Sequence, residues 1–282
     1  MFRKVELKWC KLCVLPSTRP NINFNKSEIC SACLSSKEKE KIIDWKSREL
    51  EFIKVVKRVK KKKCDYDCLI PVSGGKDSTW QVITALKYNL KPLCVTWKTP
   101  VRSKIGIQNL ENLIKLGVDH YDVTINPDVE KYFCYQTFVK FGSPAIPMHM
   151  ALHSIPLNIA EKFKIPLILW GENSAFEYGG SNKKLKGKRL DNKWREKYGV
   201  YPNLSLKKFV NKKISLRDLN IYKVQKKIKN TEELFLGYFF KWDPVKIFNI
   251  VKNFNFKSLS KPKIGFYNFA DIDDNFIITI HH

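Results

Sequence analysis

The sequence predicts an α/β fold in which a doubly wound parallel sheet carries helices on both faces. Short apolar runs alternate with segments whose apolar residues keep helical spacing. The first of these runs also ends in a pair of glycines and leads directly into a helical segment. In sheets of this kind, ligands bind at the carboxyl ends of the strands, so the functional site is expected there.

The elements follow in order along the chain. Strands are expected at 68–72, 92–97, 120–125 and 166–170. Helices are expected near 78–88, over 107–116, from Asn126 onward and after Asp243. Asn126 and Asp243 each precede a proline, which is typical of an N-cap followed by the first helical position. Residues 37–62 are expected to form one basic amphipathic helix that joins an N-terminal module to the core.

Four cysteines near the N-terminus have the spacing of a metal site. Cys10 and Cys13 form one C-x-x-C pair, and Cys30 and Cys33 form a second. Two such pairs predict a four-thiolate zinc site that is structural, because it leaves no open position for water. An iron–sulfur cluster or a redox pair is the alternative. The other four cysteines lack ligand spacing and are expected to be small buried residues.

The segment Ser73-Gly74-Gly75-Lys76-Asp77-Ser78 follows the first expected strand. A strand that ends in two glycines and opens a helix leaves backbone N–H groups pointing one way, which forms an anion site. The glycines allow positive φ and close approach of oxygens. Ser73 and Ser78 add hydroxyl donors, Lys76 adds a cation, and Asp77 can hold Mg²⁺. The adjacent glycines exclude a Walker A loop. The segment therefore indicates a pyrophosphate-binding loop for ATP, although a plain strand-to-helix turn is the simpler alternative.

The net charge of +25 is concentrated in residues 181–230 and in a second cluster from Lys54 to Lys63. Such a surface attracts RNA, phosphorylated substrates or acidic proteins, but it also arises as a solvated lysine-rich face. We do not expect nucleic acid or membrane as partners. No apolar run approaches the roughly 20 residues of a membrane span, and the first residues lack the apolar region of a signal peptide. A cytoplasmic location is expected.

Several motifs together resemble a family. They are the paired C-x-x-C module, residues 73–78, 95–97, 145–150, 171–173, 177–180 and 242–244. With these motifs the chain resembles the N-acetyl sugar amidotransferases of bacterial surface-polysaccharide and flagellar-glycan synthesis, within the PP-loop ATP pyrophosphatase superfamily. The resemblance implies a sheet of the adenine-nucleotide α-hydrolase type. The expected domains are a zinc module over 1–48, the ATP pyrophosphatase core over 49–180 and a basic lobe over 181–282 that stops earlier than in the family.

The resemblance also implies a reaction and its residues. The enzyme would adenylate the carbonyl oxygen of an acetamido group with ATP and Mg²⁺, and ammonia would then displace AMP. Lys76, Asp77 and Glu172 are the expected catalytic residues. Residues 73–78, Trp97 at the adenine and Gly171 are expected to bind ATP, while His149, Glu177 and Tyr178 are expected to bind the sugar. His153 lies one helical turn after His149, although Pro156 nearby weakens the argument for a shared face.

No glutaminase motif is visible, so the resemblance implies that separate glutaminase and cyclase-like subunits supply the ammonia. Two other functions remain open. A tRNA thiolase would use the same loop and would need a reactive thiol, for which Cys94 or Cys134 are the candidates. A zinc-ribbon binding protein with an inactive nucleotide site is the non-catalytic alternative.

Overall fold

The computed structural model describes residues 7–19, 22–173, 177, 187–195, 204–223, 230–263 and 267–276. Its centre is a five-stranded, entirely parallel sheet with the order β3-β2-β1-β4-β5. The strands are β1 (Cys68–Pro71), β2 (Pro92–Trp97), β3 (Asp119–Val123), β4 (Leu167–Trp170) and β5 (Glu232–Phe235). The predicted fold class is thus confirmed.

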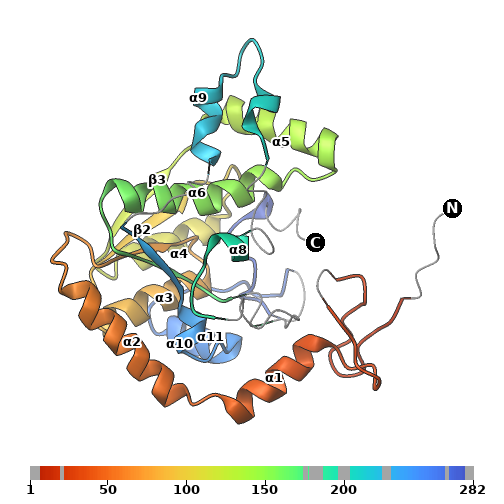
Figure 1. Ribbon diagram of the computed structural model, residues 1–282, viewed down its shortest axis with the longest axis vertical. Helices are drawn as coiled ribbons and strands as arrows, with labels where there is room; N and C mark the ends of the chain where they lie inside the picture. Colours follow the sequence, from red (N-terminus) through yellow and green to blue (C-terminus); the bar gives the residue numbers. More distant parts are fainter. Residues whose placement is uncertain are drawn as a thin grey trace.

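Helices cover both faces of the sheet, as Figure 1 shows. One face carries α5 (Pro127–Phe141) and α6 (Ile146–Lys162). The other face carries α2 (Trp45–Lys60), α3 (Lys76–Lys87), α4 (Lys104–Ile114) and α11 (Pro244–Lys252). The side chains of β1 alternate between these two cores, since Leu69 joins the first and its neighbours Cys68 and Ile70 join the second.

The order of the strands creates a switch point between β1 and β4. From β1 the chain adds β2 and β3 on one side, and it then returns to add β4 and β5 on the other. Crossovers that leave in opposite directions open a crevice at the carboxyl ends of the two central strands. The loops after β1 and β4, at residues 73–75 and 171–173, therefore meet at this crevice.

Two expectations about the elements are wrong. Residues 37–62 do not form one helix, because α1 (Ser31–Ile42) ends before α2 begins. Asp44 caps α2 by accepting a hydrogen bond from the backbone N–H of Ser47, at 3.1 Å. The expected division at residue 180 also does not separate two bodies, because β5 pairs with β4 in the same sheet. Within the described residues, the segment after 187 is part of the core.

The remaining described elements are short. They are α8 (Asn192–Trp194), η3 (Leu206–Phe209), α9 (Leu216–Leu219), η4 (Asn220–Tyr222) and α10 (Leu236–Phe239). In Figure 1 the cysteine-bearing N-terminal segment lies beyond the outer end of α1, on the periphery of the molecule. None of the helices among the described residues combines the length and the apolar composition needed to cross a membrane.

Candidate functional site

The loop between β1 and α3 has a backbone that only glycine permits. Gly74 has φ +88°, and a Cβ at this position would lie 2.7 Å from the carbonyl oxygen of Gly106. Gly74 is therefore required both by its conformation and by the close approach of α4. Gly75 is the N-cap of α3 and has no side chain to cap the helix, so the first N–H groups of α3 have no intrahelical partner.

The two serines of the loop hold its shape. The Ser78 hydroxyl donates to the carbonyl oxygen of Gly75 at 3.0 Å and accepts from the backbone N–H of Ser73 at 3.4 Å. The Ser73 hydroxyl accepts from the backbone N–H of Gly75 at 3.2 Å. The two hydroxyls that were expected to bind an anion therefore also stabilise the loop from within.

Lys76 and Asp77 form an ion pair at the start of α3. The Lys76 Nζ lies 2.6 Å from each carboxylate oxygen of Asp77. The lysine side chain is 9% exposed, whereas the aspartate side chain is 38% exposed. The lysine charge is therefore held at the loop rather than in solvent, and the carboxylate is accessible to a cation.

A cavity of about 500 Å³ lies against this loop at the carboxyl ends of β1 and β4. Residues 73 and 75–78 line one side of it, and Glu172 and Glu177 line a second. Trp242, Pro244 and the segment 267–273 line the rest. The structure thus brings together the loop of residues 73–78, Glu172 and Glu177, which come from separate parts of the sequence.

Glu172 faces the cavity while the surrounding protein raises the pKa of its carboxyl group. The main cause is desolvation by the surrounding cavity walls, although Glu172 is exposed to solvent; the nearby Asp77 carboxylate adds to it, whereas Lys76 acts in the opposite direction. A carboxylate with a raised pKa is a better proton acceptor than an ordinary glutamate. The position of Glu172 on the cavity wall suits a general base.

Gly171 lies in the same loop but serves packing. A Cβ at Gly171 would lie 3.2 Å from Gln81 Nε2 and 3.3 Å from the Trp242 ring. Its carbonyl oxygen accepts a hydrogen bond from the backbone N–H of Gly237 at 3.1 Å. Gly171 therefore lets the end of β4 approach α10 and the wall of the cavity, and it is not among the residues that line the cavity.

Trp97 and the two histidines of α6 do not line the cavity. Trp97 is buried in the core beside α5 and α6, and its Nε1 donates to Glu130 at 3.1 Å. Its predicted contact with adenine receives no support from this cavity. His149 is half-buried on α6, and His153 packs its ring against Trp170 at 5.0 Å. Tyr178 lies outside the described residues.

The cysteines proposed for a thiolase also lie elsewhere. Cys94 is buried in β2, and burial raises its pKa to about 12. Burial likewise raises the pKa of Cys134 to about 12. Both thiols are therefore protonated at neutral pH, and neither lines the cavity. The structure gives a thiolase no nucleophile at these two positions.

The four N-terminal cysteines converge as predicted. The Sγ atoms of Cys10, Cys13, Cys30 and Cys33 all lie within 4.8 Å of one another. Cys10 and Cys33 are 3.9 Å apart, and Cys13 and Cys30 are 3.5 Å apart. A tetrahedral zinc site with Zn–S bonds of about 2.3 Å needs sulfur separations of about 3.8 Å. The sulfur atoms therefore fit a structural zinc ion.

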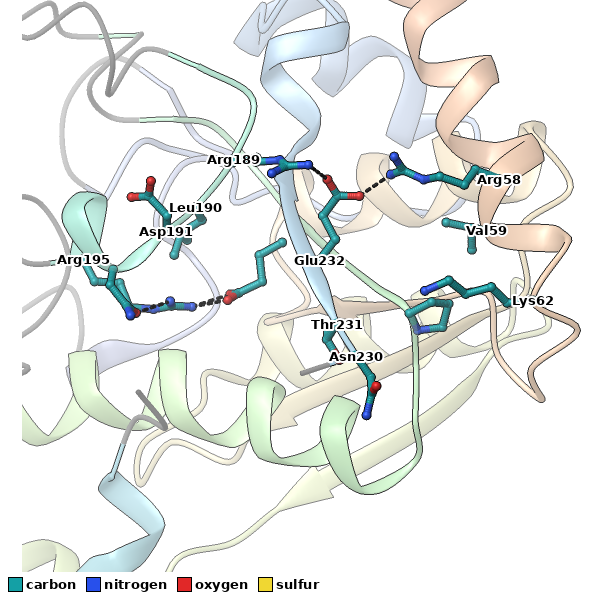
Figure 2. Close-up of a pocket in the computed structure, with 13 residues that line it drawn as sticks. Arg58, Val59, Lys62, Arg189, Leu190, Asp191, Arg195, Asn230, Thr231 and Glu232 are labelled. Carbon is teal, nitrogen blue, oxygen red and sulfur yellow. Dashed lines mark hydrogen bonds and ion pairs between the residues drawn. The ribbon is translucent and has the colours of Figure 1, made fainter. Parts of the chain in front are cut away.

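A second and larger pocket, of about 750 Å³, lies beside β5. Figure 2 shows Glu232 between Arg189 and Arg58, and Arg195 reaching the adjacent glutamate of the strand. Arg195 and Glu233 are both 1% exposed, and Trp170 also donates to Glu233, at 2.9 Å. The arginines lining this pocket are thus paired with glutamates of β5.

Several lining residues of the smaller cavity were not predicted from the sequence. They are Trp242, Pro244, Tyr267, Phe269, Ala270, Asp271 and Asp273. One signal could have indicated the last two, because an Asp-x-Asp-Asp run is unusual in a chain of net charge +25. The close approach of residues 267–273 to the loop depends on tertiary packing, which local patterns do not encode.

No model of a known protein family matches the chain. An uncharacterized protein of Methanocaldococcus jannaschii is 31% identical over 118 residues, which is 41% of this chain and 40% of that protein. The chain thus matches well under half of this relative's length.

Three solved structures show a partial similarity to the chain. An NMN synthetase from Francisella tularensis has a TM-score of 0.34 and 12% identity, covering 64% of this chain and 93% of its own. An NH₃-dependent NAD synthetase from Campylobacter jejuni has a TM-score of 0.35 and 20% identity; the match covers 47% of this chain and 58% of that protein. A predicted subunit of tRNA methyltransferase from M. jannaschii has a TM-score of 0.34 and 14% identity; the match covers 66% of this chain and 75% of that protein. These values assign neither a family nor a substrate to the chain.

Proposed function

We propose that this protein is an ATP-dependent, AMP-forming amidotransferase that acts on an N-acetyl sugar. One observation carries the proposal: the loop of residues 73–78, the buried Lys76 and the carboxylate of Glu172 line one cavity at the switch point of the sheet. This arrangement suits a reaction in which pyrophosphate departs and a neighbouring group takes up a proton. The choice of an acetamido sugar as the substrate rests on the resemblance of the chain's motifs to those of the N-acetyl sugar amidotransferases.

The reaction has two steps. The carbonyl oxygen of the acetamido group forms a bond to the α-phosphorus of ATP, and the bond from that phosphorus to the bridging oxygen breaks, so pyrophosphate leaves. Ammonia then adds to the activated carbon, the bond from carbon to the AMP oxygen breaks, and a proton is lost. The products are an acetamidino sugar, AMP and pyrophosphate.

The residues of the cavity can support each step. The unpaired N–H groups at the start of α3 and the Lys76 ammonium would stabilise the charge that develops on pyrophosphate. Asp77 would hold Mg²⁺, which supplies further positive charge at the phosphates. For this, Lys76 must exchange its contact with Asp77 for one with phosphate. Glu172 would accept the proton from the attacking ammonia.

Zinc and partner subunits complete the proposal. The four cysteines would hold a structural zinc ion that shapes the N-terminal module. Ammonia would come from separate glutaminase and cyclase-like subunits, and the basic surface would contact one of them.

The test is to measure AMP and pyrophosphate from ATP with Mg²⁺, ammonium and a panel of nucleotide-linked N-acetyl sugars. We expect AMP only with an acceptor sugar, together with a product whose mass shows an oxygen replaced by NH. Release of AMP and pyrophosphate with no change in any sugar would contradict the acceptor class. A protein that binds no ATP would contradict the proposal altogether.

A further inference from the structure

The segment 272–276 is fastened across the start of α4. The backbone N–H of Ser103 donates to the carbonyl oxygen of Asp273 at 3.0 Å, and the N–H of Asn275 donates to that of Val101 at 3.0 Å. A Cβ at Gly106 would lie 2.3 Å from the Asp273 carbonyl oxygen. Only glycine at position 106 lets the two segments approach so closely, so the path of this segment is fixed.

This path delivers the side chain of Asp273 to the phosphate loop. A Cβ at Gly75 would lie 3.6 Å from the Asp273 Oδ1. Ser73 donates a hydrogen bond to the same carboxylate. Both loop residues belong to the surface that is expected to receive phosphate oxygens. A carboxylate is thus fixed where a polyanion should bind.

The Asp273 carboxylate has no cationic partner among the described residues. Within the described residues, no lysine or arginine forms an ion pair with it, and Asp271 and Asp274 are nearby acids. Burial is the main cause that raises the pKa of the Asp273 carboxyl group, against the effect of the Ser73 hydrogen bond. A carboxylate and a triphosphate that share this loop would repel each other unless a cation lies between them.

A Mg²⁺ ion between the Asp273 carboxylate and the triphosphate would remove the repulsion between them. Mg²⁺ is held by one or two carboxylates together with phosphate oxygens, rather than by a cage made of protein alone. In the described part of the chain, only the four cysteines bring three or more possible metal ligands close together. The carboxylates of the cavity therefore form no complete cage, and a cation there would need the phosphates as further ligands.

We propose that Asp273 is a ligand of the divalent cation that accompanies ATP, on the side of the phosphate loop that faces the segment 267–276. This inference rests on the proposed function, since it assigns a further residue to the same site. Asp77 and Asp273 then approach the phosphates from α3 and from the C-terminal segment, respectively. Residues 272–276 act as the support that holds Asp273 in place.

The test uses the full-length protein, Mn²⁺ as the probe and an ATP analogue that cannot be cleaved between the α- and β-phosphates. Binding of Mn²⁺ to the protein–nucleotide complex is followed by electron paramagnetic resonance. Asp273→Asn keeps the shape and still accepts the hydrogen bond from Ser73, but it removes the charge. We expect its Mn²⁺ affinity to fall about tenfold or more. Asp273→Ser should show the same loss and serves as the second variant.

The matched control is Asp191→Asn. It makes the same change of charge at the N-cap of α8, where asparagine caps equally well, so Mn²⁺ affinity should equal that of the wild type. Unchanged Mn²⁺ affinity in Asp273→Asn would overturn the inference. It would also be overturned if that variant only bound pyrophosphate more tightly without metal, because Asp273 would then merely repel anions. A wild-type protein that binds no nucleotide would instead refute the proposed function.

Discussion

The cavity at the phosphate loop and the pocket beside β5 differ in how their charges are arranged. The larger pocket is lined by three arginines that all pair with the two glutamates at the start of β5, Glu232 and Glu233, so each arginine already has a partner within the protein. The smaller cavity keeps a phosphate loop with unpaired N–H groups and a carboxylate, Asp273, without a cationic partner among the described residues. This contrast is the reason that we propose the smaller cavity, and not the larger pocket, as the ligand site.

The largest effect is expected in the pocket beside β5, and it concerns stability. Arg195→Met leaves Glu233 buried without a cation, so we expect a loss of about 3–5 kcal/mol in the free energy of unfolding. The double variant Arg195→Met, Glu233→Gln should recover most of it. Urea unfolding measures both, and ATP affinity of the folded protein should not change. Weaker ATP binding by the folded double variant would show that this pocket also serves the ligand.

At the phosphate loop, the expected effect is on catalysis. Lys76→Met removes the cation that would stabilise departing pyrophosphate, so AMP formation should fall about 10²–10³-fold. The melting temperature should stay close to that of the wild type. Lys62→Met, in the pocket beside β5, is the control and should leave the rate unchanged. Equal rates for both variants would remove the distinction between the two regions.

The backbone of the loop can be tested with two glycines. Gly74→Ala adds a clash with the Gly106 carbonyl oxygen to the strain of a positive φ. We therefore expect the free energy of unfolding to fall by about 3 kcal/mol and ATP to bind more weakly. Gly142 has φ +69° but nothing lies within 4 Å of an added Cβ, so Gly142→Ala should cost only about 1 kcal/mol. Thermal unfolding and ATP titration measure both variants. A similar cost at the two sites would contradict the close contact between the loop and α4.

The smallest effect concerns the core pair Glu130 and Trp97. Burial raises the pKa of Glu130 to about 7 from an ordinary value of 4.5, against the effect of the hydrogen bond from Trp97. The folded state then binds the proton more tightly than the unfolded state, so stability falls as pH rises from 4.5 to 7. In Glu130→Gln, the decrease in the free energy of unfolding over this pH range should be smaller than in the wild type by about 1–2 kcal/mol. Urea unfolding at pH 5 and pH 7.5 tests this.

The same variant tests the position of Trp97. Because Trp97 lies in the core and not in the cavity, Glu130→Gln should leave ATP affinity unchanged. A marked change in ATP affinity would place Trp97 at the nucleotide after all, as its position at the end of β2 predicts.

The parts of the fold that follow local rules were predictable. The apolar strands β1, β2 and β4 and the glycine loop after β1 have strong local patterns, so the sheet and the position of the phosphate loop follow from them. β5 was missed because it begins with Glu232 and Glu233, whose charges are matched only by arginines distant in the sequence. The break before α2 was missed although Asp44 is a typical N-cap.

The sequence predicted the part of the candidate site that follows β1 and β4, but not the part formed by residues 267–273. The loop of residues 73–75 follows β1, and Glu172 and Glu177 come after β4. Because ligands bind at the carboxyl ends of parallel strands, the sequence alone predicted these residues. Trp97 also follows this rule, yet its side chain turns into the core to reach Glu130. Asp273 lies 200 residues from Ser73 in the sequence, and their contact depends on packing of residues 272–276 against Gly106.

The most direct test of the central claim is exchange of labelled pyrophosphate into ATP. The first proposed step is reversible and needs the acceptor sugar but no ammonia. We predict that exchange occurs with an N-acetyl sugar in the absence of ammonia, and that Lys76→Met abolishes it. ATP cleavage that releases orthophosphate, or a complete lack of exchange with any acceptor despite ATP binding, would contradict the account.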